Sequence, residues 1–324
     1  MYEKSSGTEN NYFDSAIYFL DEKIKNSLMK IPENIKKNAQ EIRLRLDKPV
    51  CIVCSDKNFF IKNSGLSLTT QNYHDNNILK IDKNTLEKSF YSLCEYSVYS
   101  FENQISNGFI TAKGGHRIGL CGTAVIKNGE ISGIREITSI NIRIAKEFFG
   151  CSSGIMAVLN KALENTLIIG PPASGKTSIL RDIARNISLG INIQKSIKTV
   201  IIDERCEIAG VSSNTSQFDI GLCDVMNAFP KSVGIEMAVR CLSPECIICD
   251  EIGGENDMDE LIKCANCGVN LIASVHAKNK DDFFRKNISK TLISKCGFEN
   301  LVFLGSGQNA GKINQILKAS DFKK

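Results

Sequence analysis

The chain lacks the features of a secreted or membrane-spanning protein. No stretch of its 324 residues approaches the roughly 18 consecutive apolar residues that a membrane-spanning helix needs. The first eleven residues are polar and contain no apolar signal core, so we expect a cytoplasmic protein. The formal net charge of +4 is too small to indicate a nucleic-acid-binding surface. Internal repeats and low-complexity segments are also absent, and the composition is that of an ordinary soluble globular protein.

Cysteine is plentiful, with 13 residues, but its context does not indicate disulfides or zinc. Without a secretory signal we expect the thiols to be reduced. The pairs Cys246-x-x-Cys249 and Cys264-x-x-Cys267 have the spacing of a zinc ribbon. However, the first pair lies in an apolar run that predicts a buried strand, where residues three apart face opposite sides of the sheet. Zinc needs thiolates that converge, so we expect no zinc.

Two domains are predicted, with a boundary near residue 150. Residues 1–150 mix helical and strand patterns, including a helix over 12–30 and a hairpin over 108–126, and predict a small α+β domain. In residues 151–324 strand and helix signals alternate, which predicts an α/β domain with a mostly parallel sheet covered by helices.

A phosphate-binding loop is the most informative motif of the second domain. The run from Gly170 to Thr177 fits G-x-x-x-x-G-K-[ST], between an apolar strand and a helical pattern. Its glycines allow backbone N–H groups to approach phosphate oxygens, while the helix directs its positive N-terminal end at the anion. We therefore expect ATP to bind here. The candidate nucleotide-binding residues are Gly170, Pro171, Pro172, Ala173, Ser174, Gly175, Lys176, Thr177 and Ser178.

Two later apolar runs each end in Asp-Glu, and a third ends in histidine. The acidic runs are Val200–Glu204 and Ile247–Glu251, and the third is Leu271–His276. Ligands of open α/β sheets bind at the carboxyl ends of the strands. Two acidic strand ends downstream of a phosphate loop therefore indicate a hydrolytic site with Mg²⁺.

Each of these side chains has a predicted role. Thr177 and Asp250 are expected to hold Mg²⁺, Asp250 through water. Glu251 is the first candidate for orienting or deprotonating the attacking water, and Glu204 is its rival, which the pattern does not separate from it. His276 is a candidate γ-phosphate sensor or interface switch; taken alone it would be interpreted as a structural histidine.

An arginine is also expected to stabilise the charge that develops on the γ-phosphate, and it often comes from a neighbouring subunit or domain. The candidates are Arg117, Arg135, Arg143 and Arg240. The alternation of Arg143 with Ile142 and Ile144 is equally typical of the solvated face of a strand.

The order of these motifs resembles that of the RecA-like secretion and pilus-retraction ATPases, a group of P-loop NTPases treated together with AAA+ ATPases. Segments outside the phosphate loop narrow the resemblance to the stage III sporulation protein AA family of endospore-forming bacteria. They are Glu41–Arg45, Gly114–Gly119, Asn141–Ala145, Asp203–Gly210 and Ser243–Glu245.

The resemblance implies an ATPase of the mother cell that forms a homohexameric ring. It would act in the cytoplasm, peripherally at the membrane, on the cytoplasmic face of a sporulation channel complex. Two alternatives stay open: a RecA-like ATPase that depends on nucleic acid, and a nucleotide-binding scaffold that does not hydrolyse. The mild charge argues against the former, so we expect no nucleic-acid partner.

The long polar segment between Val211 and Phe229 is the last feature of note. Long loops in compact domains are often functional, so we expect this one to face a ring pore or a membrane partner.

Overall fold

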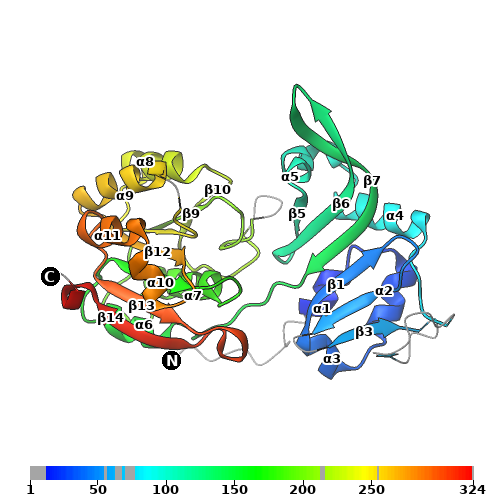
Figure 1. Ribbon diagram of the computed structural model, residues 1–324, viewed down its shortest axis with the longest axis horizontal. Helices are drawn as coiled ribbons and strands as arrows, with labels where there is room; N and C mark the ends of the chain where they lie inside the picture. Colours follow the sequence, from blue (N-terminus) through cyan, green and yellow to red (C-terminus); the bar gives the residue numbers. More distant parts are fainter. Residues whose placement is uncertain are drawn as a thin grey trace. The chain divides into compact units, whose positions relative to one another are not determined.

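The computed structural model describes residues 12–54, 57–62, 68–69, 77–211, 216–253 and 255–322 (Figure 1). The chain divides into two compact units, Met1–Lys146 and Glu147–Lys324. Within these described ranges, no helix is both long enough and apolar enough to cross a bilayer.

The first unit is built on an antiparallel sheet. Its described strands pair in the order β4-β3-β2-β1-β7-β6-β5. The strands are β1 (Ala39–Arg45), β2 (Cys51–Cys54), β3 (Asn58–Ile61), β4 (Leu68–Thr69), β5 (Phe109–Ala112), β6 (His116–Lys127) and β7 (Glu130–Arg143). The helices are α1 (Tyr12–Ile17), α2 (Glu22–Met29), α3 (Glu33–Asn38), α4 (Lys83–Leu93), α5 (Glu102–Ser106) and the 3₁₀ turn η1 (Val98–Phe101).

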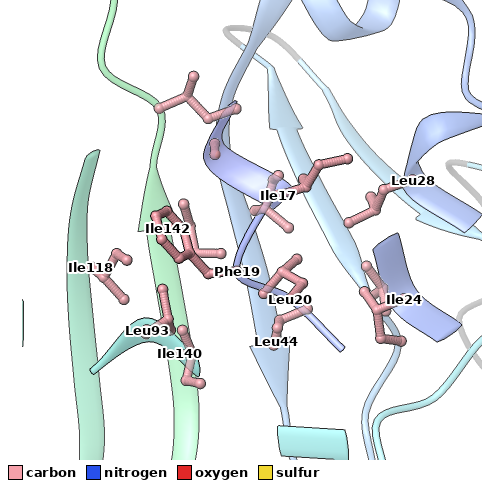
Figure 2. Packing of buried hydrophobic residues seen from close by; sticks show 14 of the residues in the cluster. Ile17, Phe19, Leu20, Ile24, Leu28, Leu44, Leu93, Ile118, Ile140 and Ile142 are labelled. Carbon is pink, nitrogen blue, oxygen red and sulfur yellow. The ribbon is translucent and has the colours of Figure 1, made fainter. Parts of the chain in front are cut away.

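Helix residues cover this sheet and form one core with it. Figure 2 shows the helix residues Ile17 and Ile24 and the turn residue Leu20 in one buried cluster that also includes the strand residues Leu44 and Ile142. The helix expected over residues 12–30 is instead two helices, α1 and α2. The chain turns after Ile17, and the Asp21 side chain caps α2 by accepting a hydrogen bond from the Lys23 N–H. A capping aspartate inside an apolar stripe therefore ended one helix and began another.

The second unit is a mostly parallel sheet with helices on both faces (Figure 1). Its described strands lie in the order β10-β9-β11-β12-β8-β13-β14, and only β14 pairs antiparallel among them. The strands are β8 (Thr166–Gly170), β9 (Thr199–Asp203), β10 (Asp224–Asn227), β11 (Cys246–Cys249), β12 (Asn270–His276), β13 (Asn300–Leu304) and β14 (Ile313–Lys318). The helices are α6 (Ser153–Leu159), α7 (Lys176–Leu189), α8 (Lys231–Leu242), α9 (Glu255–Asn266), α10 (Lys280–Arg285) and α11 (Asn287–Ser294), with 3₁₀ turns η2 (Gly307–Asn309) and η3 (Ala319–Phe322).

Alternate residues of each strand pack into two separate cores, one on each face of this sheet. Cys246 packs with Ile179 of α7 in one core, whereas Cys249 packs with Ile235 of α8 in the other. The two thiols of the first zinc-like pair therefore point to opposite faces, as their spacing on a strand predicted. Burial raises the pKa of Cys249 to about 12, which keeps this thiol protonated at neutral pH.

The segment between Val211 and Phe229 is partly buried and partly a strand; its residues 212–215 lie outside the described part of the chain. Phe218 and Ile220 are buried, and the Arg181 guanidinium of α7 stacks 3.5 Å from the centre of the Phe218 ring. Residues 224–227 form β10, which extends the sheet beside β9. These parts of the segment are folded onto the sheet, and the expectation that the segment faces a ring pore or a membrane partner stays a prediction.

A buried histidine in the first unit connects β6 to α1 and to the end of β7. The His116 side chain is fully buried, and its Nδ1 accepts a hydrogen bond from the Ala145 N–H at 3.1 Å. Its Nε2 therefore carries the proton and donates to the Ser15 hydroxyl at 2.8 Å. Burial lowers the pKa of His116 to about 4. The neutral ring is the form that the folded unit requires.

We predict that His116 makes the first unit sensitive to acid. Between about pH 6.5 and 4 the unfolded chain binds a proton at this ring that the folded chain does not, so the free energy of unfolding falls as the pH falls. The loss over this window is about 3 kcal/mol. Urea denaturation followed by circular dichroism at pH 7 and pH 4 measures it. His116→Gln is less stable at pH 7 but loses less stability on acidification; an equal pH dependence in both proteins would contradict the assignment.

Candidate nucleotide-binding site

Four strand ends of the second unit meet at one edge of the sheet. β8 ends at Gly170, β9 at Asp203 and β12 at His276, and Asp250 directly follows β11. The parallel register places His276 beside Gly170. The motifs that the sequence separates by as many as a hundred residues are therefore gathered where ligands of such sheets bind.

The loop after β8 has the backbone of a phosphate cradle. Ala173 and Gly175 adopt left-handed conformations, with φ of 58° and 89°, which turn successive N–H groups toward one side. Pro172 and Ala173 are exposed at its tip, whereas Ser174 is buried. A Cβ on Gly175 would lie 3.0 Å from the Gly311 Cα, and the Gly311 N–H donates to the Ser174 carbonyl at 2.9 Å. The β13–β14 connection therefore supports the loop, and glycine is needed at that contact.

Lys176, at the start of α7, is buried beneath this loop. Its ammonium donates to the Gly170 and Pro171 carbonyls at 3.1 and 2.8 Å and lies 3.1 Å from the His276 Nδ1. Burial lowers the pKa of Lys176, although the charges of Asp250 and Glu251 act in the opposite direction. The ammonium is held by neutral acceptors that a phosphate oxygen can replace.

Asp250 links the phosphate loop to β12. Its Oδ2 accepts a hydrogen bond from the Thr177 hydroxyl at 2.5 Å, and its Oδ1 accepts one from the Ser274 hydroxyl. The same Oδ1 accepts the Glu251 N–H at 2.9 Å. The hydroxyl and the carboxylate thus converge, and hard oxygen ligands of this kind suit Mg²⁺. Thr177 and Asp250, the predicted pair, fit that ion.

Glu251 lies between the Lys176–His276 contact and an arginine of the β9 side. Its Oε1 is 2.7 Å from the His276 Nε2, and its Oε2 pairs with the Arg205 guanidinium. Because the Lys176 ammonium can only donate to Nδ1, the imidazole proton sits on Nε2 and points at Glu251. Burial raises the pKa of Glu251, but the His276 hydrogen bond and the Arg205 charge outweigh it and leave this pKa below its usual value.

The backbone of Glu251 is unusual for this residue type. Its φ is 48°, in the left-handed region that few side chains other than glycine and asparagine adopt. Residues held in such conformations cluster at functional sites, where the surrounding structure must impose them. The conformation turns the chain sharply after β11 and directs the carboxylate toward β12.

The other Asp-Glu run is used differently. Asp203 is buried and accepts main-chain hydrogen bonds from Glu207, Ile208 and Ala209 at 2.8–3.1 Å, so it anchors the loop after β9. Burial raises the pKa of Asp203, although the N–H groups of Ala209 and Ile208 oppose the shift. Glu204, the rival base, pairs with the Lys231 ammonium at 3.3 Å. Identical sequence patterns thus provide one structural aspartate and one that faces the phosphate loop.

The structure places the arginine candidates away from this set of contacts or in the other unit. Arg240 pairs with Glu236 on the exposed side of α8. In the first unit, Arg117 stacks on the Phe109 ring at 4.2 Å, and Arg143 and Arg135 are exposed on β7. Any role for them at a nucleotide stays a prediction.

Arg205 and Lys231 were missed by the sequence analysis, yet both contact the candidate site. Arg205 directly follows the first Asp-Glu pair, which was a usable signal. Lys231 stands after a proline at the start of a helix, where a local pattern predicts nothing but a helix boundary.

The chain was compared with known families, sequences and solved structures. The family model for "Sporulation stage III, protein AA" matches residues 15–322. Stage III sporulation protein AA of Bacillus subtilis (strain 168) is 36% identical over 299 residues, 92% of each chain. The protein SEEDLING PLASTID DEVELOPMENT 1 of Arabidopsis thaliana is 30% identical over 171 residues, 50% of this chain and 24% of that protein.

Solved structures share the fold at low identity. The Legionella pneumophila ATPase DotB superposes with a TM-score of 0.55 at 13% identity, over 94% of this chain and 78% of DotB. The pilus retraction motor PilT, solved with bound ADP, superposes with a TM-score of 0.51 at 14% identity, over 85% of this chain and 77% of PilT. The predicted RecA-like α/β fold is thereby confirmed. From the match over nearly its whole length, the chain belongs to the stage III sporulation protein AA family.

Proposed function

We propose that this protein binds and hydrolyses ATP and acts as the motor of a channel complex in sporulation. The observation that carries the proposal is the chain of contacts Lys176–His276–Glu251 beside the Thr177–Asp250 pair. A scaffold that only bound nucleotide would need the loop and Lys176, but not an ionised glutamate aligned by a histidine next to them. Family membership supports the role in sporulation, and the fold shared with DotB and PilT supports the motor.

The phosphates would bind in the loop from Gly170 to Thr177, against its N–H groups and the N-terminus of α7. Lys176 would then exchange its contacts with the Gly170 and Pro171 carbonyls for phosphate oxygens. That exchange removes the ammonium from the His276 Nδ1, so the histidine registers the presence of the γ-phosphate. This is a physical route by which His276 serves as the predicted sensor.

Thr177 and Asp250 would hold Mg²⁺, which neutralises charge on the β- and γ-phosphates when bound. Asp250 is already oriented for this role because the Ser274 hydroxyl and the Glu251 N–H fix its other oxygen. A carboxylate held in this way loses little freedom when it takes part in binding a cation.

Glu251 would orient the attacking water and accept its proton. Its lowered pKa keeps the carboxylate ionised at neutral pH, and His276 and Arg205 fix its direction. To reach a water molecule the carboxylate must give up at least one of these partners. We therefore assign Glu251, and not Glu204, as the working glutamate.

The quaternary structure and location belong to the same proposal. We propose a homohexameric ring at the cytoplasmic face of the sporulation channel, in the mother cell. Two observations within the units bear on it: Arg240 pairs with Glu236 on α8, and Arg117 and Arg143 belong to the first unit. We propose that one of these arginines is supplied to the γ-phosphate by a neighbouring subunit or domain.

Substitutions in the phosphate loop and of the two glutamates test hydrolysis. Lys176→Ala should abolish nucleotide binding and turnover because it removes the phosphate-binding cation. Glu251→Gln should keep ATP binding within about threefold and lower kcat by at least about 100-fold, whereas Glu204→Gln should lower it by less than about tenfold. Phosphate release measures kcat, and titration with a fluorescent ATP analogue measures affinity. Equal losses in the two glutamine variants would contradict the assignment of Glu251.

The two aspartates should separate Mg²⁺ binding from folding. Asp250→Asn should remove most of the enhancement of ATP binding by Mg²⁺ and change the stability of the apoprotein little. Asp203→Asn should lower the free energy of unfolding by about 1–3 kcal/mol, because it weakens an acceptor of three buried N–H groups. Mg²⁺ titrations and urea denaturation measure the two effects. Asp224→Asn, at an exposed position of β10, is the matched control for both.

Mixed subunits test whether an arginine acts across an interface. Alanine variants of Arg117, Arg143 and Arg240 are each assayed alone and mixed with Glu251→Gln protein. If a neighbouring subunit supplies the arginine, its alanine variant should bind ATP but not turn it over. Mixing this variant with Glu251→Gln protein should restore turnover, because some interfaces then combine an intact arginine with an intact glutamate. Sedimentation with an ATP analogue and Mg²⁺ should show the ring; a monomer with full turnover would contradict it.

A further inference from the structure

Lys231 is a buried lysine in an unfavourable position. It is only 5% exposed and is the first residue of α8, where the helix dipole disfavours a positive charge. A buried ammonium is destabilising unless it is paired, and an apolar residue would serve packing better. The contacts of its ammonium therefore indicate what the charge is for.

The ammonium joins three elements at the candidate site. It pairs with Glu204 after β9 at 3.3 Å and with Asp257 of α9 at 3.6 Å. It also donates to the main-chain carbonyl of Glu251 at 2.8 Å. Glu251 is the residue whose left-handed backbone must be imposed by its surroundings.

Lys231 contacts Glu204 and Glu251 in different ways. Glu204 is held by its carboxylate, which the ion pair with Lys231 turns toward α8. Glu251 is held only by its carbonyl, which leaves its carboxylate directed at His276 and Arg205. The Lys231 ammonium therefore binds the carboxylate of Glu204 and, at the same time, fixes the main chain of Glu251.

We propose that Lys231 is a positioning residue for hydrolysis, which fixes the main chain of Glu251 and withholds Glu204 from the γ-phosphate. This inference rests on the proposed function, since it concerns the same site. It adds a residue that touches neither nucleotide nor water and acts through Glu251.

Lys231→Met is the principal test, because methionine keeps the volume of the stem and removes the charge. We expect kcat to fall by about 10- to 100-fold, as small misplacements of a catalytic group do, while KM for Mg·ATP changes by less than about threefold. Combined with Glu251→Gln, it should lower kcat little further, since both changes act on one group. The proposal would be overturned if the losses in kcat of Lys231→Met and Glu251→Gln were fully additive, or if Lys231→Met alone left kcat unchanged.

Hydrogen–deuterium exchange gives a measurement that does not depend on turnover. The amides of Glu251 and Ile252 are bonded to the Ser274 hydroxyl and carbonyl at 3.0 and 2.8 Å, next to the carbonyl that Lys231 holds. Lys231→Met should speed their exchange. Unchanged exchange at both amides would overturn the proposal. An absence of ATP turnover in the unsubstituted protein would instead reject the motor function. The exchange measurement would then still show whether Lys231 fixes the main chain of Glu251.

Lys36 provides the matched control. It is also a nearly buried helical lysine, paired with Asp14 at 3.5 Å and Glu33 at 2.9 Å, but it lies in the first unit. Lys36→Met should destabilise the protein without changing kcat or the exchange of Glu251. If Lys231→Met fails to fold, Asp257→Asn replaces it, because it removes one carboxylate that holds the ammonium and should shift exchange and kcat in the same directions. Equal effects of the lysine variants on kcat would mean that Lys231 is merely structural.

Discussion

The hydrogen bond between Thr177 and Asp250 joins the two halves of the candidate site, and the other contacts depend on where it places the chain. It brings the first turn of α7 against the end of β11 at 2.5 Å. Asp250 in turn binds Ser274 of β12 and the N–H of Glu251, so three neighbouring elements are fixed around one carboxylate. A parallel sheet makes this possible, because all of its strands deliver their carboxyl ends to one edge.

The same constraint explains why two identical sequence patterns have different uses. β9 lies one strand farther from β8 than β11 does, beyond the reach of the phosphate loop. Asp203 therefore turns back on its own loop and accepts three main-chain N–H groups, while Asp250 meets Thr177. Strand order, which no local pattern contains, decides which Asp-Glu pair faces the phosphate loop.

Local chemistry predicted well the parts of the fold that are local. The glycine loop, the apolar runs ending in acids and the opposite-facing Cys246 and Cys249 all follow from patterns a few residues long, and the structure has them. The helix over residues 12–30 was wrong because one capping aspartate outweighed the apolar stripe. Lys231 could not be ranked above the other cations of the sequence, since its importance comes from partners 20–27 positions away. The same holds for the tautomer of His276, which is set by Lys176, a hundred residues earlier.

The candidate site is held together by contacts that a bound nucleotide would replace. Lys176 is satisfied by two carbonyls and His276, and Glu251 by His276 and Arg205, so each group that the chemistry needs already has a partner. Such pairing is what permits charged groups to be buried at all. In the proposed function a triphosphate would bind by exchange: its phosphate oxygens would take over Lys176, and the His276 Nδ1 would lose its donor. Lys231 is the exception, because its partners are the main chain of Glu251 and two carboxylates that no phosphate displaces. The backbone of the site can therefore stay fixed while its side chains change partners. Under this condition, binding of one phosphate would cause a defined movement of those side chains.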